Sequence, residues 1–145
     1  MPLWSYFPIG LALFFGGLII LSAIAGFPDE VSPKAAILSI APLWMLVLLL
    51  VLVPVGEALL WTVFFTEAIA RVFRAPILGA VCGVFAYSVL FHGPEGLLAV
   101  AVSGWFGTVL GFLYIVMRVR SRWGAFINVV CLRWAFVAYI YVLVI

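Results

Sequence analysis

The sequence has little charge. Only 8% of its 145 residues are Asp, Glu, Lys or Arg, whereas a soluble domain carries roughly 25%. Hydrophobic residues make up 69% of the chain, which leaves too little polar surface to coat a water-soluble globule. No segment alternates apolar and polar residues, the pattern that strands of a membrane barrel show. The composition therefore predicts an all-α protein, a polytopic bundle of transmembrane helices that satisfy their own backbone hydrogen bonds.

Histidine and cysteine are also scarce. The single histidine, His92, excludes a His-rich zinc site and a haem held by two histidines. Cys82 and Cys131 both fall inside apolar runs and lack the spacing of metal ligands. Buried membrane cysteines usually behave as small hydrophobic residues. We therefore expect no metal and no other cofactor.

Long apolar runs are what the sequence has in abundance. Five of them approach or exceed the ~20 residues that a helix needs to cross a bilayer. They cover residues 8–27, 35–55, 75–91, 97–117 and 125–145. Only short loops remain between them, so we predict about five spans and one membrane domain over residues 1–145. No Lys or Arg precedes the first run, which favours a retained span over a signal peptide.

Arginines mark two of the gaps between the runs. One gap holds Arg71 and Arg74, and the other holds Arg118, Arg120 and Arg122. The positive-inside rule places both gaps in the cytoplasm. Two runs separate the gaps, so the chain crosses the membrane twice between them and both gaps can lie on the same side. Counting back from them places the N-terminus in the cytoplasm. These arginines are most simply a topology signal, and we expect membrane lipid but no nucleic acid as a partner.

The first gap is of a different kind. It contains Asp29 and Glu30 between two prolines, with Lys34 directly after the second, a composition typical of an external turn.

Proline and glycine predict features within the runs. The second apolar stretch continues past its run to residue 70, and Pro54 interrupts it. Because proline removes a backbone hydrogen bond, we expect a bent helix or two helical pieces meeting near Pro54. Gly79 and Gly83 form one pair of glycines at helical contact spacing, and Gly107 and Gly111 form another. Such faces let helices approach closely, and we favour packing within the bundle over homodimerisation.

Six polar residues fall inside or at the ends of the apolar runs. They are Glu57, Glu67, Ser88, His92, Asn128 and Arg133. A charged side chain in a membrane costs about 2.5–3.5 kcal/mol on insertion scales, so each is a candidate functional residue. Glu67 precedes Arg71 by four residues, the spacing of an ordinary stabilising ion pair on one helix.

Glu57 has two interpretations. It is either a structural carboxylate paired with Arg133, or a general base that acts with His92 on a water molecule. Asn128 is an amide donor that either stabilises an oxyanion or bonds a neighbouring helix. Arg133 needs a counter-charge, which Glu57 or Glu95 could supply. We favour the functional interpretation of Glu57, because intramembrane charges are functional by default.

The order of these residues resembles a known family. Pro-Val-Gly-Glu-Ala-Leu-Leu-Trp contains Glu57, Ser-Val-Leu-Phe-His ends at His92, and Ser-Arg-Trp-Gly-Ala-Phe-Ile-Asn ends at Asn128. Intervals of 35 and 36 residues separate the three. Over residues 54–133 the chain resembles the CPBP family of intramembrane proteases, also called the Abi or CAAX-protease-and-bacteriocin-processing family. The family pattern is Glu-Glu-x-x-x-Arg, Phe-x-x-x-His and His-x-x-x-Asn. The chain departs from it at Ala58, Thr62, Ser88, Asn128 and Leu132.

The resemblance implies a CPBP-like helical core and a divergent glutamate-type endopeptidase in a bacterial inner membrane. Glu57 and His92 would activate water, and Asn128 would donate a hydrogen bond to the tetrahedral intermediate. The substrate would be a membrane-embedded or lipidated protein. The alternative is a catalytically inactive CPBP-like binding or scaffold subunit of a membrane complex. A third possibility is a small transporter-like component. A water shared by Glu57 and His92 favours catalysis, whereas pairing of Glu57 with Arg133 favours the scaffold.

Overall fold

The computed structural model describes residues 2–25 and 42–144, and within these ranges the protein is all-helical. Short 3₁₀ turns cover Leu3–Ser5 (η1) and Gly93–Glu95 (η4), and π-helical segments cover Ala58–Phe64 (η2) and Ala86–Phe91 (η3). The α-helices are α1 (Tyr6–Ala25), α3 (Leu43–Glu57), α4 (Phe65–Phe73), α5 (Pro76–Phe85), α6 (Leu97–Arg118) and α7 (Arg122–Val144). The predicted all-α class is confirmed. The predicted external turn lies outside the described residues.

Length and composition single out two of the helices in the described ranges. The helix Leu43–Phe73, with 31 residues, and α6, with 22 residues, are both long and apolar enough to cross a membrane. Tyr6–Leu21 and Pro76–Phe91 are shorter apolar helices. The two long helices differ in burial. In the most apolar stretch of α6, 50% is buried inside the protein, compared with 11% in the most apolar stretch of Leu43–Phe73.

We call Leu43–Phe73 the crossing helix. It comprises α3, η2 and α4 in one uninterrupted run of about 46 Å. The helix continues through Pro54 rather than breaking there. Irregularity comes just afterwards, where the backbone N–H of Ala58 meets the carbonyls of both Pro54 and Val55 and the π-helical segment η2 begins. A π-helical segment takes up a local mismatch in the hydrogen-bond ladder without ending the helix.

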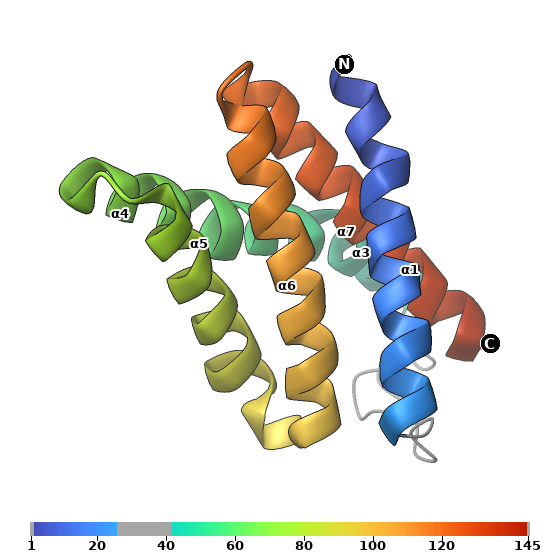
Figure 1. Ribbon diagram of the computed structural model, residues 1–145. Helices are drawn as coiled ribbons and strands as arrows, with labels where there is room; N and C mark the ends of the chain where they lie inside the picture. The colour runs from blue at the N-terminus through green and yellow to red at the C-terminus, as the bar shows by residue number, and fades with distance from the viewer. Residues whose placement is uncertain (1, 26–41, 145) are drawn as a thin grey trace.

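Three of the other described helices, α5, α6 and α7, pack on the crossing helix. Its first part, α3, contacts α7; its middle, η2, contacts α5, α6 and α7; its last part, α4, packs on α5. Figure 1 shows it passing behind α6 at a steep angle, while α1 and α6 run side by side. The start of α1 lies at the same end of the molecule as the α6–α7 turn, and the end of α7 lies at the opposite end (Figure 1).

Glycines set the close approach of α5 to the crossing helix. A Cβ atom at Gly83 would overlap the carbonyl oxygen of Trp61, and one at Gly79 would lie 2.6 Å from the carbonyl oxygen of Phe65. Only a residue without a side chain allows backbones to meet this closely. On α6, Gly107 and Gly111 face Val84 and Ala80 of α5 in turn. The predicted use of these glycines for packing within the bundle is confirmed.

The apolar core lies between α1, α6 and α7. Phe14 of α1 makes edge-to-face contacts with Phe106 of α6 at 4.9 Å and with Phe136 of α7 at 5.0 Å between ring centroids. Leu110 and Val129 are fully buried beside them. This core fixes α7 against α6, and α7 carries both Asn128 and Arg133.

Candidate functional site

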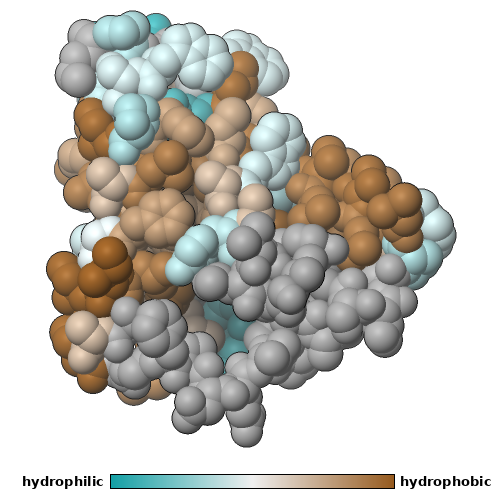
Figure 2. All heavy atoms as spheres, turned by 90° about the vertical axis from the view of Figure 1, so that its right-hand side faces the viewer, coloured by the Kyte–Doolittle hydropathy of each residue, from teal (hydrophilic) through white to brown (hydrophobic). Residues whose placement is uncertain are grey.

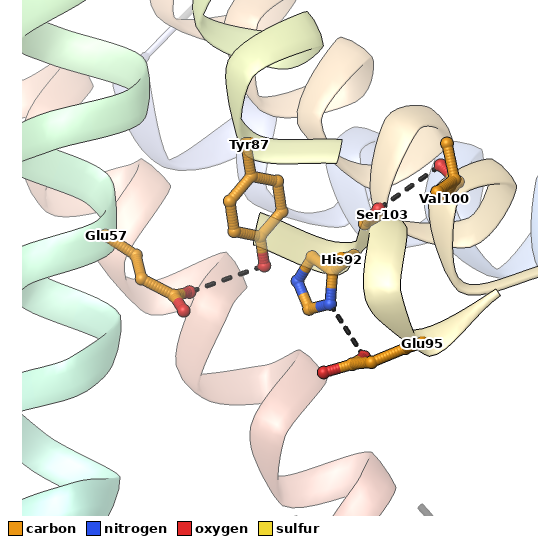
Figure 3. A network of polar contacts seen from close by, with 6 residues as sticks. All are labelled: Glu57, Tyr87, His92, Glu95, Val100 and Ser103. Atoms are coloured by element: carbon orange, nitrogen blue, oxygen red, sulfur yellow. Dashed lines mark hydrogen bonds and ion pairs between the residues drawn. The ribbon is translucent and has the colours of Figure 1, made fainter. Parts of the chain in front are cut away.

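Glu57 ends α3 and lies near the middle of the crossing helix. Its Oε2 atom accepts a hydrogen bond from Nη1 of Arg133 on α7 at 2.5 Å. The same oxygen accepts a longer hydrogen bond from the Tyr87 hydroxyl on η3 at 3.5 Å, as Figure 3 shows. The pairing of Glu57 with Arg133 that the sequence offered as one interpretation is therefore confirmed. We call these three residues the Glu57 cluster.

Arg133 is almost completely enclosed, with 2% of its side chain exposed. Its guanidinium carbon lies 4.8 Å from the centroid of the Tyr87 ring and 5.7 Å from that of Phe106. A planar, delocalised guanidinium suits such stacking on aromatic rings. Its Nε atom is buried and has no hydrogen-bond partner in the described part of the chain. Glu57 thus carries the counter-charge of a buried cation.

Tyr87 contacts both Glu57 and His92, and the sequence prediction missed it. Its ring makes an edge-to-face contact with the His92 ring, with centroids 4.8 Å apart, while its hydroxyl points at Glu57 (Figure 3). Tyr87 lies inside the apolar run 75–91 and was not among the candidate polar residues. The signal that could have found it is that a buried tyrosine hydroxyl usually has a hydrogen-bond partner.

His92 is held by a carboxylate of its own. Its Nδ1 atom lies 2.9 Å from Oε2 of Glu95, three residues later in η4. The other ring nitrogen, Nε2, is buried and has no hydrogen-bond partner among the described residues. Figure 3 shows the imidazole beside Tyr87, with Glu57 and Glu95 on opposite sides of it. Glu57 and His92 thus contact the same tyrosine, but no hydrogen bond joins them directly in the described ranges.

Asn128 is buried, with 3% of its surface exposed. It precedes Arg133 by five residues on α7, which is about 7.5 Å along the helix axis and about 140° around it. Asn128 and Arg133 therefore lie on different faces of α7. Nothing in the geometry assigns Asn128 an oxyanion-binding role, which stays a prediction.

A narrow cleft opens beside the Glu57 cluster. It has room for about one water molecule. Its polar lining comes from Thr62, Tyr87 and Arg133, and Gly83 and Gly107 are among the glycines that line it. The cleft suits a water that hydrates the buried guanidinium rather than an extended peptide.

Glu67 lies in a second polar cluster, ten residues further along the crossing helix. Its carboxylate lies 3.0 Å from Nε of Arg118 and 3.8 Å from Nη2 of Arg122, and it accepts a hydrogen bond of 3.0 Å from the Tyr114 hydroxyl. We call these four residues the Glu67 cluster. The predicted pair with Arg71 was wrong, because the Glu67 side chain turns inward to the end of α6 instead of along its own helix.

The described ranges hold no group of three or more His, Cys, Asp or Glu side chains that could bind a metal ion. Cys82 and Cys131 are half-buried free thiols.

No protein-family model matches the chain, and neither a curated protein nor a solved structure matches it. The CPBP-like character of residues 54–133 therefore stays a prediction from the motifs.

Proposed function

We propose that the chain is a polytopic membrane protein. The supporting observation is its exposed apolar surface. Along the crossing helix, Leu43, Trp44, Leu52, Phe64 and Val72 are each 58% exposed or more. Figure 2 shows one face on which apolar side chains gather in large patches and strongly hydrophilic residues are few. Water-soluble monomers rarely expose contiguous apolar surface on this scale, whereas lipid covers it at no cost.

The predicted topology of five spans with a cytoplasmic N-terminus is part of the proposal, as is a bacterial inner membrane. Glu67, near the start of α4, contacts Arg118 and Arg122 at the α6–α7 turn, and Arg71 follows one helical turn later on α4. The start of α1 lies at the same end as the α6–α7 turn (Figure 1). Both placements agree with the parity that the positive-inside rule requires. The crossing helix, however, runs across α1 and α6 rather than along them (Figure 1), so its own place among the five spans draws no support from this arrangement.

Within that membrane, the proposed role is a non-catalytic binding or scaffold subunit. The observation that carries this role is the contact of 2.5 Å between Glu57 and Arg133. A general base must offer its carboxylate to a reacting proton. Here the same oxygen neutralises a buried guanidinium and accepts the Tyr87 hydroxyl. Removing Glu57 from this contact would leave an uncompensated buried charge, so the carboxylate is tied to stability.

One observation favours the second candidate, a divergent intramembrane glutamate-type endopeptidase. Tyr87 brings Glu57 and His92 to a single site, and Glu95 orients the imidazole through Nδ1. A histidine held by a carboxylate at one nitrogen, with the other unpartnered, has the arrangement that general-base histidines use. Cleavage by this route would use the Oε1 atom of Glu57, because Oε2 already accepts hydrogen bonds from Arg133 and Tyr87.

A cleavage assay separates the two candidates. The protein is reconstituted in liposomes with a quenched fluorescent prenylated peptide that ends in a CAAX sequence. The variants are Glu57→Gln and His92→Ala, with Thr108→Val as the control. Thr108 is exposed on α6, and its hydroxyl bonds the carbonyl of Gly104 on the same helix.

The scaffold role predicts no cleavage by any of the four proteins and a lowered thermal stability for Glu57→Gln. Cleavage by the wild type and by Thr108→Val that both Glu57→Gln and His92→Ala abolish would overturn it in favour of the endopeptidase.

A further inference from the structure

Charge is distributed very unevenly over the molecule. Glu67 near the start of α4 contacts Arg118 and Arg122, two of the three arginines at the α6–α7 turn, and Arg71 and Arg74 follow four and seven residues later at the end of α4. These five arginines and Glu67 carry a net charge of +4, whereas the whole chain carries +2. Among the described residues, these five arginines are five of the six basic side chains, and Glu67 is the carboxylate that contacts two of them.

The surplus arginines are exposed. Arg122 has 66% of its side chain exposed although it lies 3.8 Å from Glu67. Arg71 and Arg74 are both exposed, and neither has an ion pair within the described ranges. Arg118, in contrast, is drawn inward by Glu67 and is only 17% exposed. Glu67 therefore joins α4 to the end of α6 and the start of α7, while the side chains of Arg71, Arg74 and Arg122 remain exposed.

Large apolar side chains flank these guanidiniums. Val72 and Phe73 follow Arg71 and are 73% and 66% exposed. Val119 and Trp123 adjoin the arginines of the turn and are 86% and 76% exposed. Arginine next to exposed tryptophan and aliphatic side chains is typical of the boundary between acyl chains and headgroups, where the long side chain reaches toward the phosphates.

We infer that this end of the protein is a binding site for an anionic phospholipid headgroup. The arginines concerned are Arg71, Arg74, Arg120 and Arg122. A guanidinium binds a phosphodiester through two parallel hydrogen bonds, which a point charge does not reproduce. The flanking residues Val72, Phe73, Val119 and Trp123 contact the acyl chains of the same lipid. Basic pockets between helices near the membrane surface bind anionic headgroups in this way. The inference rests on the proposed membrane insertion.

The test titrates phosphatidylglycerol or phosphatidylcholine into the detergent-purified protein and follows the thermal unfolding temperature. Phosphatidylglycerol is expected to raise that temperature at a concentration at least ten-fold below that of phosphatidylcholine. Arg71→Gln and Arg74→Gln are each expected to raise the midpoint concentration roughly five-fold, since each arginine near such a surface contributes about that factor. Arg71→Lys is the matched control that keeps the charge, and it should lose less.

Equal effects of the two lipids would overturn the inference, as would an unchanged midpoint in both glutamine variants. Inorganic phosphate that reproduces the full shift would assign the site to a free anion and overturn the lipid. Resistance of the protein to extraction from membranes by alkaline carbonate is measured in parallel. A protein that stays in the membrane but shows no preference for phosphatidylglycerol sinks the headgroup site alone, whereas extraction by carbonate sinks the proposed membrane insertion.

Discussion

The Glu57 cluster and the Glu67 cluster are built from the same parts. Each pairs a glutamate of the crossing helix with arginine and a tyrosine hydroxyl from other helices. They differ in position. Arg133 is 2% exposed and has one carboxylate partner, whereas the arginines of the Glu67 cluster are 17% and 66% exposed and share theirs. The glutamates rank the other way, because Glu57 is 19% exposed and Glu67 is 13% exposed, so the contrast lies in the arginines. Arg133 is enclosed and depends on one counter-charge, whereas the arginines of the Glu67 cluster share theirs and are more exposed.

The largest expected difference between the clusters comes from deleting one arginine of each. Arg133→Met leaves Glu57 without its cation in the interior, and we expect the free energy of unfolding to fall by about 3–5 kcal/mol. Arg118→Met leaves Glu67 with Arg122 and should cost about 1 kcal/mol. Unfolding by SDS titration in mixed micelles measures both values. Similar losses in the two variants would show that the clusters are energetically alike.

Packing beside the Glu57 cluster gives the next largest effect. Gly83→Ala forces the new methyl group against the carbonyl oxygen of Trp61 and separates α5 from the crossing helix, at a cost of about 2–3 kcal/mol. Gly56→Ala is the matched control, since a Cβ atom there meets nothing within 4 Å. It should stabilise the helix by about 0.5–1 kcal/mol. The same SDS titration reports both, and a tolerated Gly83→Ala would contradict the close backbone contact.

Removal of a tyrosine hydroxyl should cost more stability in the Glu67 cluster than in the Glu57 cluster, which is the opposite of the order expected for removal of an arginine. Tyr114 donates at 3.0 Å to Glu67, whereas Tyr87 donates at 3.5 Å to Glu57. Tyr114→Phe should therefore cost about 1 kcal/mol and Tyr87→Phe less than about 0.5 kcal/mol. Thermal unfolding of the two variants checks the ranking. A larger loss for Tyr87→Phe would mean that its hydroxyl is the stronger link in the interior.

The smallest expected effect is a difference in how the stability of the two clusters depends on salt concentration. Raising the ionic strength screens exposed charges but reaches enclosed pairs much less. The stability difference between wild type and Arg118→Met should shrink by a few tenths of a kcal/mol from low to high salt. The difference for Arg133→Met should stay constant over the same range. A salt-dependent Arg133→Met difference would place the Glu57 cluster in contact with solvent.

The sequence predicted the helical class and the helix positions well, because apolar runs of bilayer length have few other solutions. It also named Glu57 and Arg133 as possible partners, since an arginine inside an apolar run needs a counter-charge. It assigned Glu67 to Arg71 because the spacing of four residues is visible in a sequence. The contact of Glu67 with Arg118, 51 positions later, depends on how the helices cross and cannot be read from the sequence. Tyr87 was missed because one hydroxyl barely alters the apolar character of its run.

A double-mutant cycle on Glu57 and Arg133 tests the central claim most directly. The four proteins are wild type, Glu57→Leu, Arg133→Met and the double variant, and the free energy of unfolding of each is measured in mixed micelles. We predict that the double variant is close to wild type, because an apolar pair replaces the buried ion pair. The coupling energy then at least equals the loss of about 3–5 kcal/mol expected for Arg133→Met alone. A coupling energy below about 0.5 kcal/mol would mean that Glu57 does not depend on Arg133. It would contradict the structural role on which the proposed function rests.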